Sequence, residues 1–295
     1  MTAKIISGTQ VAEEIREELK VKVKGLKDRG ITPGLVMVRV GEDPASVSYV
    51  RGKTKASEEL GIYSETIVFP KDAREEEVLA KVEELNKDPR FHGILVQLPL
   101  PRHIDADKVL NAIDPRKDVD GFHPVNVGRL LIGEPYFLPC TPHGVQQLLV
   151  RSGYDPAGKH VVICGRSNIV GKPLMAILVQ KRKGANATVT VCHTGTKDLA
   201  SVTREADILV AAMGSPKVIT ADMVKEGAVV IDVGVNRVPD ESKAAGYRLV
   251  GDTDFDAIKE KAKAITPVPG GVGPTTVTML MVNTVRAAEQ QAGLA

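Results

Sequence analysis

Short, continuous apolar runs alternate with segments of helical periodicity along the 295-residue chain. Apolar runs of this kind, bounded by glycine, proline or charged residues, predict strands that are buried on both faces, as in parallel sheets covered by helices. In the first half the expected strands are 34–40 (GLVMVRV), 64–69 (SETIVF) and 93–97 (GILVQ), and the expected helices are 44–60 and 74–86. We therefore predict an α/β fold with a mostly parallel sheet.

The pattern restarts near residue 140, which for a chain of this length predicts two domains. The second, 140–270, contains the apolar runs HVVIC, ATVTVCH, ADILVAA and AVVIDVGV and is expected to be a Rossmann-like nucleotide-binding domain. The last helix is expected at 275–291, after that sheet is complete. We expect the segment 271–295 to pack back on the first domain, 1–139.

Composition excludes several classes of protein. Lys+Arg 39 against Asp+Glu 37 gives a net charge of +2, which argues against a nucleic-acid or membrane-surface binder. The three cysteines, Cys140, Cys164 and Cys192, fit neither a disulfide framework nor a CxxC metal site, and no histidine spacing suggests zinc. The first residues lack the apolar core of a signal peptide, and the uncharged stretch 264–285 is broken by prolines and glycines. We expect a cytoplasmic globular protein without a metal.

The sequence GRSNIVGKP, at 165–173, follows a buried strand and opens a helix. Dinucleotide-binding turns need this context because the amides at the start of the helix hold the pyrophosphate. The glycines depart from the G-x-G-x-x-G pattern, since Ser167 stands at the second glycine and Gly171 comes four residues later. An ordinary strand-to-helix turn is the alternative, and the strands that follow favour the cofactor.

Residues at and beyond this loop favour NADP over NAD. An Asp or Glu about 20 residues beyond such a loop usually binds the free ribose hydroxyl of NAD. Here the strand TVTVC is followed by His193 and Thr194, and Arg166 within the loop supplies a guanidinium for a 2′-phosphate. The competing interpretation is that Arg166 is a solvated loop charge.

The helix 44–60 and the strand 93–97 carry candidates for catalysis. Helical spacing places Lys53 on the same face as Tyr49 and Leu60, away from the other charged residues. A lysine there either snorkels to solvent or acts as an amine near neutral pH, and the spacing leaves both open. Gln97 ends its strand, where ligands of α/β sheets gather, although a strand-terminal hydrogen bond explains it equally well.

Two loops are weaker candidates when taken alone. Asp120 precedes a glycine in KDVDGFHP, where a plain turn is the default. The segment TPVPGGVGPTT, at 266–276, can bring bare backbone close to a flat or charged group. A stiff connection into the last helix is its simpler explanation.

These motifs together resemble the bifunctional methylenetetrahydrofolate dehydrogenase/methenyltetrahydrofolate cyclohydrolase family, the bacterial FolD type. The resemblance covers nearly the whole chain, through YVRGKTKA, GILVQLPLP, KDVDGFHPVNVGRL, PCTPHGV, GRSNIVGKP, AVVIDVGVNR, VGDTDF and ITPVPGGVGPTTVTML. It implies oxidation of 5,10-methylenetetrahydrofolate with NADP+ and hydrolysis of the product to 10-formyltetrahydrofolate. It also implies a cleft between the domains, a homodimer through the cofactor domains, and a role in one-carbon metabolism and purine biosynthesis.

The family pattern implies a role for each matched position. Tyr49 would stack on the folate ring system, Asp120 would bind the pterin, and Gln97 would tune Lys53, the central acid or base. The implied catalytic residues are Tyr49, Lys53, Gln97 and Asp120. The implied folate-binding residues are Tyr49, Lys53, Val96, Gln97, Leu98, Pro99, Asp120, Pro269, Gly270 and Gly271. The implied NADP-binding residues are Gly165, Arg166, Ser167, Ile169, Val170, Gly171, His193, Thr194 and Val235.

Two positions depart from the family pattern. Thr275 stands where many relatives carry methionine, and we expect it to alter packing beside the folate. Thr194 stands where NADP-dependent relatives often have serine, and it keeps the hydroxyl.

Three rival functions are an NADP-dependent dehydrogenase of a small acid, similar to shikimate or malate-oxidising enzymes, a monofunctional folate dehydrogenase, and a non-catalytic NADP-binding sensor. The first and third leave Tyr49, Lys53 and Gln97 unexplained, and Lys53 argues against the second.

Overall fold

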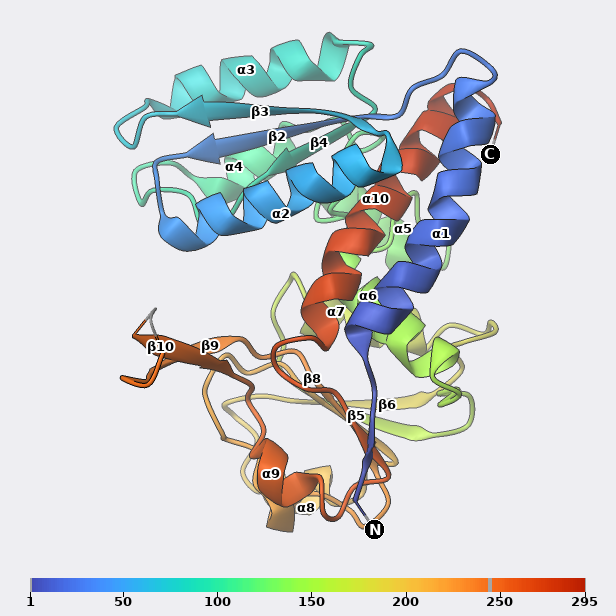
Figure 1. The fold of residues 1–295 in the computed structure, drawn as a ribbon, viewed down its shortest axis with the longest axis vertical. Coiled ribbons are helices and arrows are strands. Elements are labelled where there is room, and N and C mark those ends of the chain that lie inside the picture. Colours follow the sequence, from blue (N-terminus) through green and yellow to red (C-terminus); the bar gives the residue numbers. More distant parts are fainter. Residues whose placement is uncertain (1, 244–245, 295) are drawn as a thin grey trace. The chain divides into compact units, whose positions relative to one another are not determined.

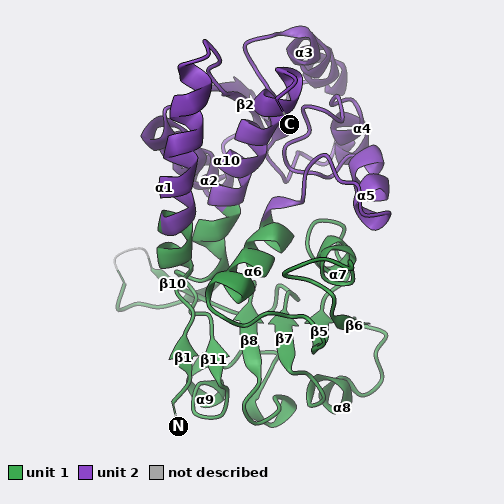
Figure 2. Cartoon of the chain, turned by 90° about the vertical axis from the view of Figure 1, so that its right-hand side faces the viewer, with its two compact units in different colours: residues 1–13, 141–276 green, residues 14–140, 277–295 purple. Residues whose placement is uncertain are grey.

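The computed structural model describes residues 2–243 and 246–294. The chain forms two compact units, which Figure 2 colours separately. Unit 1 contains residues 1–13 and 141–276, and unit 2 contains residues 14–140 and 277–295. Each unit has its own parallel sheet, so the predicted two-domain α/β fold is confirmed.

The sheet of unit 2 has three parallel strands in the order β3-β2-β4. Its strands are β2 (Gly34–Val40), β3 (Tyr63–Phe69) and β4 (Gly93–Val96). Helices α2 (Pro44–Leu60) and α3 (Glu75–Lys87) lie on opposite sides of this sheet (Figure 1). The central strand β2 is buried except for Arg39, as expected for an apolar run covered on both faces.

One face of this sheet contributes to a hydrophobic cluster of unit 2. Val36, Val38 and Ile94 pack there with Val78 and Val82 of α3. The shorter helices of this unit are α4 (Ala106–Asn111) and α5 (Pro124–Leu131). Val109 of α4 joins the same cluster, so α3 and α4 cover one face together.

Local signals determine both ends of α2. The Asp43 carboxylate accepts a hydrogen bond from the Ser46 amide at 2.8 Å, and Pro44 occupies the first turn. At the other end Gly61 has φ 70°, and its amide donates to the Glu58 and Ser57 carbonyls. The helix predicted at 44–60 is therefore confirmed with both its ends.

The sheet of unit 1 has six parallel strands in the order β1-β11-β8-β7-β5-β6 (Figure 2). Their bounds are β1 (Lys4–Ile5), β5 (His160–Cys164), β6 (Thr188–Cys192), β7 (Ile208–Ala211), β8 (Val229–Asp232) and β11 (Ala264–Ile265). The helices are α6 (Cys140–Arg151), α7 (Gly171–Leu178), α8 (Leu199–Thr203), the 3-10 turn η1 (Ala221–Met223) and α9 (Phe255–Ile258). An antiparallel pair, β9 (Asn236–Pro239) and β10 (Tyr247–Val250), completes the unit.

Two long helices contribute residues to both units. They are α1 (Gly8–Lys27) and α10 (Val272–Gln291). The sequence places the whole segment 1–139 in the first domain, whereas β1 pairs with β11 in the sheet of unit 1. The assignment of 1–139 with 271–295 to folate and of 140–270 to NADP stays a prediction. No helix within residues 2–243 and 246–294 combines the length and apolar character that a membrane crossing requires.

Candidate active site

A lysine and a glutamine meet at the carboxyl end of the sheet of unit 2. Nζ of Lys53, in the middle of α2, donates to Oε1 of Gln97 over 2.9 Å. The backbone amide of Gln97 donates to the Val38 carbonyl at 2.8 Å, and its side-chain Nε2 donates to the Leu98 carbonyl at 2.7 Å. Because both ends of the glutamine side chain are bound, its carbonyl oxygen is held toward the amine. Lys53 is half-buried, and its amine is oriented by Gln97.

Asp120 lies within electrostatic range of this amine. Burial raises the pKa of the Asp120 carboxyl from 3.8 to about 6, the Lys53 charge opposes that rise, and the buried Asp118 adds to it. Such a carboxyl changes its charge close to neutral pH, as groups at functional sites often do. Lys53, Gln97 and Asp120 therefore form one polar group within unit 2.

Tyr49 corrects the helix face predicted for α2. Its side chain is 51% exposed, whereas Val50 and Ser57 are buried. Ala56 and Leu60 of the predicted face are buried, and the buried face extends to Val50 and Ser57 in place of Tyr49. Ser57 can be buried because its hydroxyl donates to the Lys53 carbonyl at 3.0 Å. Tyr49 is left as an exposed aromatic ring one helical turn from Lys53.

The remaining folate-site candidates divide between the two units. Val96 is buried at the end of β4, and Leu98 and Pro99, which a cis peptide bond joins, follow Gln97. Pro269, Gly270 and Gly271 belong to the loop before α10 in unit 1.

The start of α1 holds this glycine loop. The Gly8 and Thr9 amides donate to the Gly270 carbonyl at 2.9 and 3.3 Å. A Cβ on Gly8 would lie 1.6 Å from the Gly271 carbonyl oxygen, so only glycine fits there. Gly270 itself has φ 96°, a conformation that favours glycine.

Thr275 is buried within unit 1. Its hydroxyl donates to the Val272 carbonyl at 2.8 Å, and a Cβ on Gly144 of α6 would lie 2.7 Å from the Thr275 Oγ1 atom. The threonine therefore packs against a neighbouring helix of its own unit. Its expected effect on packing beside folate stays a prediction.

The loop between β5 and α7 has the close backbone packing that a dinucleotide needs. Gly165 has φ 138°, and a Cβ there would lie 2.2 Å from the Ala212 carbonyl oxygen. A Cβ on Gly171 would lie 2.0 Å from the Gly165 carbonyl oxygen. These two glycines let the chain turn tightly into α7, as the glycines of dinucleotide loops do. The Ser167 hydroxyl accepts a hydrogen bond from the Val170 amide at 3.1 Å.

The exposed side chains around this loop suit NADP. Arg166, Ser167 and Ile169 are exposed. After β6, the His193 imidazole accepts from the Gly195 amide at 3.0 Å, and Thr194 is exposed beside it. With a cation in the loop and no carboxylate directly after β6, these residues fit a phosphorylated ribose. Val235, 48% exposed, follows β8 at the same edge of the sheet.

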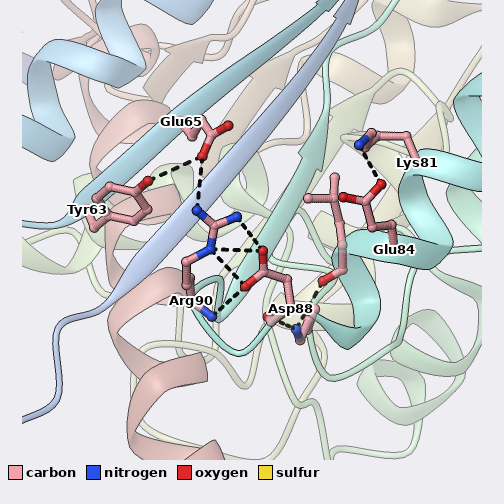
Figure 3. Close-up of polar contacts among 8 residues, drawn as sticks. Tyr63, Glu65, Lys81, Glu84, Asp88 and Arg90 are labelled. Atoms are coloured by element: carbon pink, nitrogen blue, oxygen red, sulfur yellow. Dashed lines mark hydrogen bonds and ion pairs between the residues drawn. The ribbon is translucent and has the colours of Figure 1, made fainter.

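The amino ends of the strands in unit 2 carry a different polar cluster (Figure 3). Nη2 of Arg90 donates to Oδ2 of Asp88 at 2.6 Å, and this hydrogen bond lowers the pKa of the Asp88 carboxyl. Arg90 also lies 3.9 Å from Glu65, which accepts from the Tyr63 hydroxyl at 3.2 Å. Exposed pairs of this kind contribute little to stability. They contrast with Lys53, whose amine donates to a neutral amide.

Comparison with known proteins decides the family. The sequence model "Tetrahydrofolate dehydrogenase/cyclohydrolase, catalytic domain" matches residues 6–120, and "Tetrahydrofolate dehydrogenase/cyclohydrolase, NAD(P)-binding domain" matches residues 139–292. The chain belongs to the tetrahydrofolate dehydrogenase/cyclohydrolase family. The small-acid dehydrogenase considered from the sequence is thereby set aside.

Relatives of the tetrahydrofolate dehydrogenase/cyclohydrolase family match over the full length. "Bifunctional protein FolD" of Syntrophus aciditrophicus is 62% identical over 294 residues and covers 100% of both chains. The crystal structure of the bifunctional enzyme FolD from Campylobacter jejuni has a TM-score of 0.92 at 47% identity and covers 98% of this chain and 99% of its own. The Trypanosoma brucei FolD, solved with NADP cofactor and an inhibitor, has a TM-score of 0.94 at 42% identity and covers 99% of both chains.

Two further residues of this family member bear on the site and were missed from the sequence. Nδ2 of Asn283, on α10, donates to the Val119 carbonyl at 2.7 Å and to the Leu138 carbonyl at 2.8 Å. The Cys140 thiol lies 3.8 Å from Oδ1 of Asp120. Asn283 thus fixes the backbone directly before Asp120. A polar residue inside the apolar run of the last helix was the signal that could have identified it.

Proposed function

We propose that this chain oxidises 5,10-methylenetetrahydrofolate to 5,10-methenyltetrahydrofolate with NADP+, and then hydrolyses the product to 10-formyltetrahydrofolate. Membership of the family and the full-length similarity to bifunctional FolD proteins support both activities. The observation that carries the second activity is the 2.9 Å hydrogen bond between Lys53 and Gln97. It presents an oriented amine at the carboxyl end of the sheet, where α/β proteins bind ligands.

Lys53 moves the proton in the hydrolytic step. Water adds to the methenyl carbon and loses one proton. The resulting hydroxyl loses its remaining proton as the bond from that carbon to N5 breaks, and N5 takes up one proton, so that one proton is released overall. The Lys53 amine, directed by the neutral Gln97 oxygen, can take a proton from the water and deliver one to N5. Gln97 contributes by holding the amine in one direction, which positions it for each transfer.

Asp120 and Tyr49 bind the folate ring system. The Asp120 carboxyl, with its pKa raised to about 6, is mostly ionised at neutral pH and can accept hydrogen bonds from pterin N–H groups. The exposed ring of Tyr49 offers a flat apolar face for stacking. Val96, Leu98 and Pro99 complete the proposed lining within unit 2, and Pro269, Gly270 and Gly271 are proposed folate-binding residues of unit 1.

NADP is the proposed cofactor, and when bound its nicotinamide supplies a hydride acceptor for the bridging methylene of the folate. Arg166, Ser167, His193 and Thr194 bind its phosphates and ribose, and the tight turn at Gly165 and Gly171 lets the backbone approach the pyrophosphate. Ile169, Val170 and Val235 provide the apolar contacts. The exposed guanidinium of Arg166 supports NADP over NAD.

We also propose a homodimer through the nucleotide-binding domains and a cytoplasmic location. The location is supported by three cysteines that are all free thiols. Gel filtration with light scattering tests the dimer, and a mass of one chain would contradict it.

The activities are tested by absorbance with purified protein. Mixing with 5,10-methylenetetrahydrofolate and NADP+ is expected to form NADPH, and mixing with methenyltetrahydrofolate alone is expected to accelerate decay of the methenyl absorbance. NADPH formation without faster decay would contradict the hydrolytic activity. The absence of both signals with folded protein would contradict the proposed function.

A further inference from the structure

Two buried aspartates in unit 1 interlock at the carboxyl end of the sheet. Asp232 is 2% exposed at the end of β8, and Asp252 is 0% exposed beyond β10. Buried carboxylates require hydrogen bonds to remain in a folded protein. Both receive donors on each of their two oxygens, and these donors come from neighbouring loops.

The Asp252 carboxylate holds the loop after β7. Its Oδ2 accepts from the Met213 and Gly214 amides at 2.6 and 2.9 Å, and its Oδ1 accepts from the Ser215 amide at 3.0 Å. Three successive amides directed at one group form an anion-binding nest. Here the anion is a side chain of the protein itself. Oδ1 also accepts from Nδ2 of Asn236 at 2.8 Å, which ties the start of β9 to the same carboxylate.

The Asp232 carboxylate holds the backbone that carries Asp252. Its Oδ1 accepts from the Gly234 and Asp252 amides, both at 2.9 Å. Its Oδ2 accepts from the Thr253 amide at 2.8 Å and from the Thr253 hydroxyl at 2.6 Å. The end of β8 therefore fixes Asp252, and Asp252 fixes the loop after β7.

Two glycines show how closely the loops pack around this pair. A Cβ on Gly234 would lie 2.1 Å from Oδ1 of Asp252, and a Cβ on Gly251 would lie 1.9 Å from Oδ2 of Asp232. No other residue type fits either position without displacing a carboxylate. The arrangement therefore tolerates little movement of either loop.

These loops lie where a dinucleotide domain binds its cofactor. Ala211 and Asp232 end the neighbouring parallel strands β7 and β8, and the loops that follow contain 213–215 and Val235. Cofactors bind outside the carboxyl ends of such strands. We propose that Asp252, fixed by Asp232, is a positioning residue that sets the shape of the cofactor site at the ends of β7 and β8. This inference rests on the proposed function.

Asp252→Asn tests the proposal, because the new amide nitrogen cannot accept from the backbone amides that face it. We expect the Kd for NADPH, followed by reduced-nicotinamide fluorescence, and the KM for NADP+ to rise about tenfold, because a buried amide loses its acceptor. The KM for methylenetetrahydrofolate and the rate of methenyl hydrolysis should stay within about twofold, because Lys53, Gln97 and Asp120 belong to unit 2. Unchanged cofactor binding, or a proportional loss of both activities, would overturn the proposal.

Asn236→Ala keeps the proposal testable if Asp252→Asn does not fold. It removes one of the donors to Asp252 and should raise the Kd for NADPH about threefold, with methenyl hydrolysis unchanged. The matched control is Asp254→Asn, which removes the exposed ion pair of Asp254 with Lys217 (3.0 Å) and should leave the Kd unchanged. An Asn236→Ala variant with wild-type cofactor binding would contradict the inference. Failure of the wild-type protein to bind NADPH would instead contradict the proposed function.

Discussion

Nζ of Lys53 and Oε1 of Gln97 lie 2.9 Å apart, and the same glutamine donates through Nε2 to the Leu98 carbonyl. The amine is therefore directed by a neutral group whose own orientation is fixed by the backbone. A carboxylate in place of Gln97 would pair with the ammonium and hold its proton. The neutral amide orients Lys53 while leaving it able to exchange protons.

Removing the amide tests its positioning role. In Gln97→Ala, Lys53 loses its acceptor and samples more directions, so we expect methenyl hydrolysis to fall about tenfold. NADPH formation should fall less, because hydride transfer needs no proton on Lys53. Steady-state rates of the two reactions measure the difference.

Gln147→Ala is the matched control for that variant. It removes a different glutamine side chain, whose Oε1 accepts a hydrogen bond from Nε of Arg151 at 3.1 Å on α6. It should leave both rates unchanged. Equal losses of both rates in Gln97→Ala would contradict a specific role in hydrolysis.

The half-buried Asp120 makes stability depend on pH. Its pKa is raised from 3.8 to about 6, so the folded chain binds more protons than the unfolded chain between these values. The free energy of unfolding therefore falls as pH rises through this window, by on the order of 2–3 kcal/mol. Asp120→Asn lacks this titration and should gain stability relative to wild type by about that amount between about pH 4 and about pH 8.

Urea unfolding of both proteins at the two pH values measures this gain. The same variant should bind folate more weakly, because the amide replaces an acceptor for pterin N–H groups. A stability difference that does not change with pH would contradict the raised pKa of Asp120.

Asn283 should matter to both stability and folate binding. Asn283→Ala removes the amide that donates to the Val119 and Leu138 carbonyls, which costs about 2–4 kcal/mol of unfolding free energy. Because Asp120 follows Val119 directly, the KM for folate should rise while the KM for NADP+ stays unchanged. Gln290→Ala, near the end of the same helix, is the control, and similar behaviour of the two variants would contradict the assignment.

Arg166 should determine the preference for NADP. Arg166→Ala is expected to raise the KM for NADP+ about 10–100-fold through loss of a charge-assisted hydrogen bond, with little change for NAD+. Lys181→Ala, which removes an exposed cation after α7, is the control. Equal KM values for NADP+ and NAD+ in the wild-type protein would count against the role of Arg166.

Much of the fold could be predicted because its signals are local. The bounds of α2 follow from Asp43, Pro44 and Gly61, which all lie within or beside the helix. The apolar runs likewise identified β2, β5 and β8. Strands β1 and β11 have two residues each and pair Lys4 with Ala264, so no periodicity or local signal revealed them.

The site was predicted only in part from spacing. Lys53 and Gln97 were singled out by helix face and strand end, and the structure brings them into contact. Tyr49 was placed on the apolar face but is exposed, since period alone does not show where a buried Ser57 can replace an apolar side chain. Asn283 lies 164 residues from the Val119 carbonyl that it binds, which no sequence pattern records. Roles for these residues stay predictions.

The most direct measurement follows both reactions in one preparation of Lys53→Met, with Lys55→Met as the control. Lys55 is exposed on the same helix and lies 3.8 Å from Glu59. We predict that Lys53→Met loses methenyl hydrolysis by a factor on the order of 10²–10⁴, while NADPH formation persists and Lys55→Met behaves as wild type. Methenyl hydrolysis at the wild-type rate in Lys53→Met would contradict the account.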